Sequence, residues 1–164
     1  MIRFVDGNRI TLLQNGTDYF PALEAAIDRA VREIYLETYI FEHDHTGQRI
    51  TAALKRAARR GITTHLLLDG YGTKDLSREV IEDMRSAGVQ VLIYRPVLAK
   101  FRRSSYRRLH RKIAVMDNRI AFVGGINIID DMDTPDQTPP RYDYAVAVEG
   151  TLVQAVHATA RRLW

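Results

Sequence analysis

Two spacings of apolar residues alternate along the chain. Short runs rich in β-branched and aromatic residues predict strands, and these runs cover residues 10–13, 34–41, 63–68, 89–94, 111–116, 119–123 and 142–148. Between them, apolar residues recur at helical spacing, which predicts helices over residues 17–32, 46–60, 77–87 and 151–164. Strands that alternate with helices in this way predict an α/β fold in which helices cover the sheet.

Turn-forming and capping residues mark several of the predicted ends. Asn15-Gly16 predicts a turn after the first strand, and Thr17 or Asp18 is expected to cap the helix that follows. Asp117-Asn118 predicts a two-residue hairpin turn, because both residue types tolerate a positive φ. Residues 130–141 are acidic and rich in proline, which predicts a mobile loop.

Length and composition limit the class of protein. The 164 residues suit a single domain with a sizeable core. A hydrophobic content of 46% and a charged content of 27% are typical of globular proteins and exclude a disordered, collagen-like or coiled-coil chain. There is no apolar run of membrane-spanning length, no signal-peptide pattern and no cysteine, so disulfide and thiolate chemistry are excluded. A cytoplasmic location is the default expectation.

Positive charge is concentrated in one segment. The chain has 24 lysines and arginines against 20 acidic residues, and residues 95–112 hold eight of those bases and no acid. Without this segment, 16 basic residues face 20 acidic ones, a net charge of −4. The protein is therefore mildly acidic with one strongly basic segment, which favours an anionic partner such as a phospholipid or a nucleic acid.

The predicted hairpin brings chemically useful residues together. If Asp117-Asn118 forms a tight turn, counting outward along both strands sets Gly125 opposite His110. Because side chains alternate along a strand, His110 and Lys112 point the same way, and Asn127 lies just beyond. The hairpin would thus gather an imidazole, an ammonium and an amide.

This group surrounds Gly124 and Gly125, which would let a phosphate approach the backbone closely. A nucleophilic or acid–base group beside fixed donors for anionic oxygens is what phosphoryl transfer requires. The alternative interpretation is that a histidine and a lysine two positions apart near a turn are ordinary surface residues, since short motifs often match by chance. Spacing alone leaves both interpretations open.

The spacing His110-x-Lys112, four residues, Asp117, six residues, Gly124-Gly125-x-Asn127 resembles the HKD motif of the phospholipase D superfamily. Many members have Gly-Ser-x-Asn, and here Gly125 stands at the serine position. This Gly-Gly variant, together with four other stretches, is similar to bacterial cardiolipin synthases of the B type; the stretches are residues 10–16, 36–41, 67–72 and 143–146. The resemblance implies a mixed β-sheet flanked by helices on both faces. Residues 1–164 would be one such domain, the N-terminal HKD half, with the second motif absent from them.

The resemblance also implies roles for individual residues. His110 would attack phosphorus and carry a phosphohistidine intermediate, or act as the general acid if a partner histidine attacks. Lys112 and Asn127 would hold the non-bridging phosphate oxygens, and Asp143 would hydrogen-bond the second ring nitrogen of His110. Asp117 belongs to the motif, and its turn position suggests that it holds the hairpin. The family uses neither metal nor cofactor.

The basic segment is expected to contact a membrane, because apolar residues lie between its cations. The residues assigned to this contact are Lys100, Phe101, Arg102, Arg103, Arg107 and Arg108. The alternative is a solvated loop. The expected partners are an anionic phospholipid (phosphatidylglycerol), the inner face of the cell membrane as a peripheral surface, and a second HKD half or a homodimer partner. Nucleic acid is the less favoured partner.

Three functions compete. The favoured one is a phosphatidyltransferase half-domain of a cardiolipin synthase, which transfers a phosphatidyl group between phosphatidylglycerol molecules and is inactive as an isolated monomer. The second is a single-motif nuclease of the same superfamily that acts as a homodimer. The third is an inert membrane-binding module, which is disfavoured because His110, Lys112, Asn127 and Asp143 are all present.

Two other groups of residues are candidates. His43-Asp44-His45 offers two metal ligands, but the sequence shows no third nearby. Glu37 and Tyr39 alternate on a predicted strand and would face the site, although sheet packing explains them equally well.

Overall fold

A seven-stranded mixed sheet runs through the molecule in the order β1-β7-β6-β5-β2-β3-β4. The computed structural model describes residues 4–96, 108–134 and 138–164. The strands are β1 (Asn8–Gln14), β2 (Glu33–Thr38), β3 (Thr63–Asp69), β4 (Gln90–Tyr94), β5 (Ile113–Met116), β6 (Ile120–Gly124) and β7 (Tyr144–Gly150). Strands β2, β3 and β4 are parallel to one another, and every other neighbouring pair is antiparallel.

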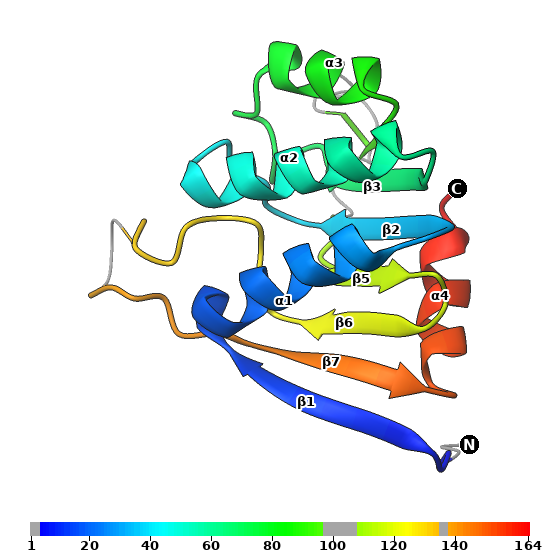
Figure 1. The fold of residues 1–164 in the computed structure, drawn as a ribbon. Coiled ribbons are helices and arrows are strands. Elements are labelled where there is room, and N and C mark those ends of the chain that lie inside the picture. The colour runs from blue at the N-terminus through cyan, green and yellow to red at the C-terminus, as the bar shows by residue number, and fades with distance from the viewer. Residues whose placement is uncertain (1–3, 97–107, 135–137) are drawn as a thin grey trace.

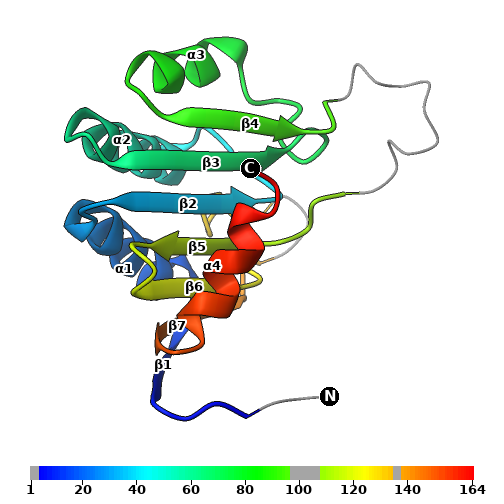
Figure 2. The same ribbon diagram turned by 90° about the vertical axis from the view of Figure 1, so that its right-hand side faces the viewer.

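Helices cover both faces of this sheet (Figures 1 and 2). They are α1 (Asn15–Arg29), α2 (His45–Arg59), α3 (Arg78–Ser86) and α4 (Val153–Arg161). Helices α1, α2 and α3 share one face, where their apolar residues form the main core, and α4 packs on the other face. The expected α/β fold with helices on both faces is confirmed. Among the described helices, none combines the length and apolarity needed to cross a bilayer.

Helix α1 differs from the prediction at both ends. It begins at Asn15, which has a φ of 57°, so neither Thr17 nor Asp18 is its N-cap residue. The Asp18 carboxylate instead accepts a hydrogen bond from the backbone N–H of Gln14 at 3.0 Å, and so satisfies the N-cap residue itself. The helix ends at Arg29 rather than at residue 32, because the backbone N–H groups of Val31 and Arg32 donate to a side chain from the hairpin described below.

The β5–β6 hairpin has the predicted turn but a different register. Asp117 and Asn118 have φ angles of 55° and 54°, and the N–H of Arg119 donates to the carbonyl of Met116 at 2.9 Å. The ladder then pairs Met116 with Ile120, so Arg119 is an extra residue on one side. The expectation that Gly125 lies opposite His110 is therefore wrong by one residue.

Candidate active site

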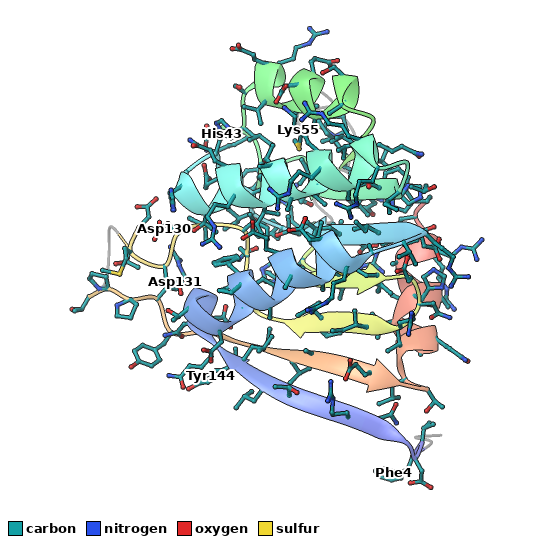
Figure 3. All side chains as sticks on the ribbon, in the orientation of Figure 1. Phe4, His43, Lys55, Asp130, Asp131 and Tyr144 are labelled. Carbon is teal, nitrogen blue, oxygen red and sulfur yellow. The ribbon has the colours of Figure 1, made fainter. Side chains whose placement is uncertain are left out.

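The motif residues meet at one edge of the sheet. Antiparallel pairing brings the ends of β2 and β6 to the same edge as the starts of β5 and β7 (Figure 1). His110 and Lys112 precede β5, Asn127 follows β6, and Asp143 precedes β7. Figure 3 shows Asp130 and two neighbouring labelled residues, Asp131 and Tyr144, at this end of the sheet, and Phe4 at the other.

His110 and Lys112 are in direct contact. The Lys112 ammonium lies 3.1 Å from Nε2 and 3.3 Å from Nδ1 of His110, and it donates to the His110 carbonyl at 3.2 Å. An ammonium can only donate, so a hydrogen bond to a ring nitrogen requires that nitrogen to be unprotonated. The prediction that both side chains point the same way is confirmed, although the strand itself starts only at Ile113.

Burial makes the Lys112 ammonium a strong hydrogen-bond donor for a bound anion. The residue is 7% exposed, and burial lowers the pKa of its ammonium, while the nearby Asp143 carboxylate acts in the opposite direction. A cation with little water around it interacts more strongly with an arriving anion than a solvated one does. His110, by contrast, is exposed at the sheet edge, where a substrate can reach it.

Tyr39 forms one wall around this pair. Its ring centroid lies 4.7 Å from that of His110, and the Lys112 ammonium lies 5.3 Å from the Tyr39 ring centre. Strand β2 ends at Thr38, one residue earlier, so Tyr39 stands where the chain leaves the sheet. Of the two residues proposed to face the site from this strand, Tyr39 does so.

Asn127 presents its amide nitrogen. Its Oδ1 accepts a hydrogen bond from the backbone N–H of Ile40 at 3.0 Å, which fixes the orientation of the amide because an N–H needs an acceptor. Within the described ranges, Nδ2 has no protein acceptor, so it remains a donor for a ligand. This arrangement suits binding of a phosphate oxygen.

Asp143 lies close to the motif without touching the imidazole. Its Oδ1 accepts from the N–H of Tyr144 at 2.7 Å, and no hydrogen bond joins it to His110 in the part of the chain that the structure describes. Asn15 holds its backbone from both sides, donating to the Asp143 carbonyl at 2.9 Å and accepting from its N–H at 3.1 Å. The sequence analysis predicts only a turn at Asn15 and not its bonds to Asp143. The one sequence signal for this role is that Asn15 precedes a glycine, a position that favours the positive φ it adopts.

The two motif glycines are packed closely against the start of β7. The N–H of Gly124 donates to the Lys112 carbonyl at 3.3 Å, and that of Gly125 donates to the Tyr144 carbonyl at 2.9 Å. A Cβ at Gly125 would lie 2.1 Å from Oδ1 of Asp143, and one at Gly124 would lie 2.4 Å from the Cα of Ala145. The structure thus gives these glycines a packing role, because they let the start of β7 approach; their binding of phosphate stays a prediction.

Asp117 lies away from this cluster, at the opposite end of β5. Its carboxylate accepts hydrogen bonds from the backbone N–H groups of Val31 at 2.9 Å, Arg32 at 2.7 Å and Glu33 at 3.0 Å. Burial alone would raise the pKa of Asp117, but these donors outweigh it and the pKa is lowered. Of the motif residues expected to be catalytic, Asp117 is therefore a structural one, as its turn position suggested.

Glu37 lies on the other face of the sheet, paired with Arg111. The carboxylate is fully buried, and Oε2 is 2.8 Å from Nη2 of Arg111, but the N–H directions do not align with the oxygens. Burial raises the pKa of Glu37 to about 7, and the Arg111 charge only partly opposes this. Because Arg111 lies between His110 and Lys112 in the chain, the Glu37–Arg111 pair lies on the sheet face opposite to the side chains of His110 and Lys112.

The acids around the loop after β6 serve structural bonds. Asp131 accepts from the N–H of Gly16 at the start of α1, and burial raises its pKa. Asp44 caps α2 through the N–H of Gly47 at 2.8 Å and accepts from the N–H of Asp130 at 2.6 Å. In the described part of the chain, no three histidine or acidic side chains are grouped as metal ligands.

The membrane-contact residues lie outside the described residues, except Arg108. Its guanidinium lies 4.2 Å from the ring centre of Tyr71, next to the site. The expectation of membrane contact through residues 100–107 therefore stays a prediction.

Comparison with known proteins supports the resemblance to cardiolipin synthases. Residues 23–164 match the family model described as cardiolipin synthase, PLD-like domain. The chain is 42% identical to cardiolipin synthase B of Escherichia coli K12 over 97% of its own length, and 38% identical to a cardiolipin synthase of Geobacillus kaustophilus over 76%. It spans 41% of the first of these relatives and 25% of the second.

Solved structures agree on the fold. The phospholipase D family member Nuc from Salmonella typhimurium matches with a TM-score of 0.69 at 17% identity, covering 94% of this chain and 93% of Nuc. NucT from Helicobacter pylori matches with a TM-score of 0.74 at 18% identity, covering 95% of both chains. These likenesses show the fold, and the match of residues 23–164 to the family model shows that the chain belongs to the cardiolipin synthase, PLD-like domain family.

Proposed function

We propose that this domain is the N-terminal half of a cardiolipin synthase and supplies one histidine to phosphatidyl transfer. The observation that carries the proposal is the contact of 3.1 Å between the Lys112 ammonium and the His110 ring, at an open edge of the sheet. It occurs in a chain that is 42% identical to cardiolipin synthase B over 97% of the chain's own length. Lys112 and the Asn127 amide nitrogen would bind the non-bridging oxygens of the phosphodiester.

The proposed reaction needs two imidazoles. One attacks phosphorus of a phosphatidylglycerol, so that a P–N bond forms and the P–O bond to the head-group glycerol breaks. The other gives its proton to the departing glycerol oxygen. A hydroxyl of a second phosphatidylglycerol then loses its proton to that second imidazole and attacks phosphorus, and the P–N bond breaks. The products are cardiolipin and glycerol, and no metal or cofactor takes part.

His110 is one of these imidazoles, and a second HKD half supplies the other. A general acid must come within about 3 Å of the oxygen that it protonates, so one hairpin cannot serve both sides of the phosphate. Residues 1–164 hold a single His-x-Lys motif of this kind. We therefore expect a monomer of this chain to fold but not to turn over phosphatidylglycerol.

A cardiolipin assay tests the proposal, with the chain alone and with a second HKD half supplied from a relative. Cardiolipin should form only in the second case, and His110→Ala should remove nearly all of it without unfolding the protein. Asp143→Asn should cost less, because it disturbs charge and orientation rather than the reacting atom. A correctly folded His110→Ala protein that keeps more than a few per cent of the activity would contradict the assignment.

The second candidate function is that of a single-motif nuclease acting as a homodimer. One observation favours it: the eight basic residues in residues 95–112, with no acid among them, suit the phosphates of a nucleic acid as well as those of a lipid. Sedimentation combined with a cardiolipin assay and a DNA-cleavage assay separates the two proposed functions. A dimer that cleaves DNA and makes no cardiolipin would replace the first proposal with the second.

The proposed partner surface is an anionic bilayer at the inner face of the cell membrane. Eight basic residues without an acid in residues 95–112 support peripheral binding, since each base near an anionic surface contributes about 1 kcal/mol. The phospholipid substrate proposed here would be drawn from the same surface.

A further inference from the structure

A buried carboxylate joins the end of β3 to the residue before His110. Asp69, the last residue of β3, is 1% exposed. Its Oδ1 accepts from the N–H groups of Tyr71 at 2.9 Å and Gly72 at 3.0 Å, and its Oδ2 accepts from the N–H of Leu109 at 2.6 Å. One side chain therefore ties its own loop to a segment 40 residues later.

The same loop also supports the aromatic wall of the site. Gly72 lies so close to Tyr39 that a Cβ on it would come within 2.1 Å of the Tyr39 carbonyl oxygen. Gly70 is equally close to the strand end beyond β4, where a Cβ would lie 2.4 Å from the Arg95 carbonyl oxygen. The loop is thus packed tightly on both sides, and its position determines where Tyr39 stands.

His110 is consequently held from two directions by one loop. Its backbone follows Leu109, which Asp69 binds, and its ring packs at 4.7 Å on Tyr39, against which Gly72 packs. We propose that Asp69 is a positioning residue for His110: it does not touch the reacting atoms but sets the backbone and the ring wall that orient them. The catalytic meaning of this role rests on the proposed function of His110, whereas the positional part does not.

Asp117 provides a matched control for Asp69. Both are buried aspartates whose carboxylates accept hydrogen bonds from three backbone N–H groups, and both join segments distant in sequence. They lie beyond opposite ends of β5, and only Asp69 binds next to His110. A role limited to stability would give both substitutions the same consequences.

The experiment compares Asp69→Asn with Asp117→Asn in the whole chain. An asparagine has one acceptor oxygen, so it can satisfy Tyr71 and Gly72 together or Leu109, but not all three. We expect it to keep the two bonds of its own loop. The amide hydrogen exchange of Leu109 should then rise about tenfold or more, in line with the loss of one buried charge-assisted bond.

The His110 ring is the second readout. Its proton chemical shifts carry the ring current of Tyr39, and they can be assigned by comparison with His110→Gln. Asp69→Asn should move these shifts toward the values of an exposed histidine, and Asp117→Asn should leave them in place. Unchanged His110 shifts and slow Leu109 exchange in a folded Asp69→Asn protein would overturn the proposal.

Kinetic measurements, and hydrogen exchange in the unmodified chain if the variant does not fold, complete the test. With a second HKD half supplied, Asp69→Asn should lower kcat about 10- to 100-fold and leave KM nearly unchanged, because misplacement affects the reaction more than binding. If Asp69→Asn does not fold, fast exchange of Leu109 in the unmodified chain contradicts the tie, and exchange as slow as that of the β5 amides supports it. Failure of His110→Ala to abolish transfer would refute the proposed function but would leave the NMR results standing.

Discussion

The fully buried carboxylate of Glu37 forms an ion pair with Arg111, whose side chain is 31% exposed, behind the candidate site. A carboxylate with no exposed surface is stabilised in its neutral form, and the misaligned guanidinium of Arg111 only partly offsets this. Arg111 lies between His110 and Lys112 in the chain, so its side chain and the Glu37 carboxylate that it contacts lie on the face opposite to the side chains of His110 and Lys112. The ionisation of Glu37 therefore affects the stability of the strand that carries the motif.

Glu37→Gln is expected to change the pH dependence of stability. The pKa of Glu37 is about 7 in the folded protein and 4.5 as the ordinary value, so the folded state binds this proton more tightly. Its contribution is fully present below pH 4.5 and is lost as the pH rises through 7, by about 3 kcal/mol. Urea unfolding between pH 4 and pH 8 measures this as a fall in wild-type stability relative to the glutamine variant.

Glu82→Gln is the control, because that carboxylate is exposed and forms a surface pair with Arg85. Its free energy of unfolding should follow the wild-type curve. Parallel curves for wild type and Glu37→Gln would mean that Glu37 is solvated or better paired than the structure indicates.

The β5–β6 hairpin and the connection from α1 to β2 stabilise each other. The Asp117 carboxylate accepts from the backbone N–H groups of Val31 and Arg32 in that connection and of Glu33, the first residue of β2, and the Glu33 carbonyl accepts from the Asp117 N–H at 3.0 Å. These bonds fix where α1 stops and where β2 begins, which sets the alignment of β2 beside β5. The aspartate of the motif thus acts at the level of the elements rather than of the reaction.

Asp117→Asn should lower the free energy of unfolding at pH 7 by about 1–3 kcal/mol, the cost of leaving a buried backbone donor unpaired. The lowered pKa of Asp117 means that its contribution is present above the ordinary value of 3.8 and is lost as the pH falls through the folded-state value. The wild-type and variant stabilities should therefore converge in acid. Denaturant unfolding at pH 7 and at successively lower pH checks this.

Asp75→Asn serves for comparison, because the Asp75 side chain is 73% exposed and lies 3.8 Å from Lys74. It should change stability by less than about 0.5 kcal/mol. An Asp117→Asn protein as stable as this control at pH 7 would argue against the tie between hairpin and connection.

The charge of the whole molecule is divided between a mildly acidic body and one basic segment. We expect binding to phosphatidylglycerol vesicles to weaken when four arginines are replaced by glutamine: Arg102, Arg103, Arg107 and Arg108. Added salt should weaken binding of the unmodified chain as well, because ions screen surface charges. Vesicle co-sedimentation at low and high salt measures both effects.

The matched control replaces four exposed arginines elsewhere by glutamine: Arg29, Arg59, Arg78 and Arg119. Both variants lower the formal net charge from +4 to 0, so only the place of the charge differs. Equal loss in both variants would indicate a general charge effect, and no loss in either would make the segment a solvated surface. Loss of DNA binding without any vesicle binding would favour the nuclease.

The sequence by itself determined the order of strands and helices and the identity of the motif. Apolar periodicity predicts the elements because each must bury one face. Alternation and the Asp117-Asn118 turn place His110, Lys112 and Asn127 at one end of a hairpin, and the structure confirms that His110 and Lys112 point the same way. These are local properties, which depend on neighbours a few residues apart.

Tertiary structure decided the boundaries and the roles. Residues 30–32 continue the apolar pattern of a helix, but Asp117 accepts hydrogen bonds from the N–H groups of Val31 and Arg32, about 85 residues away in the chain, and α1 ends at Arg29. Residues 39–41 continue the pattern of a strand, but the Asn127 oxygen takes the Ile40 N–H and turns the chain into the site. A hydrogen bond between distant segments leaves no trace in local spacing, so its effects appear only when the chain is folded.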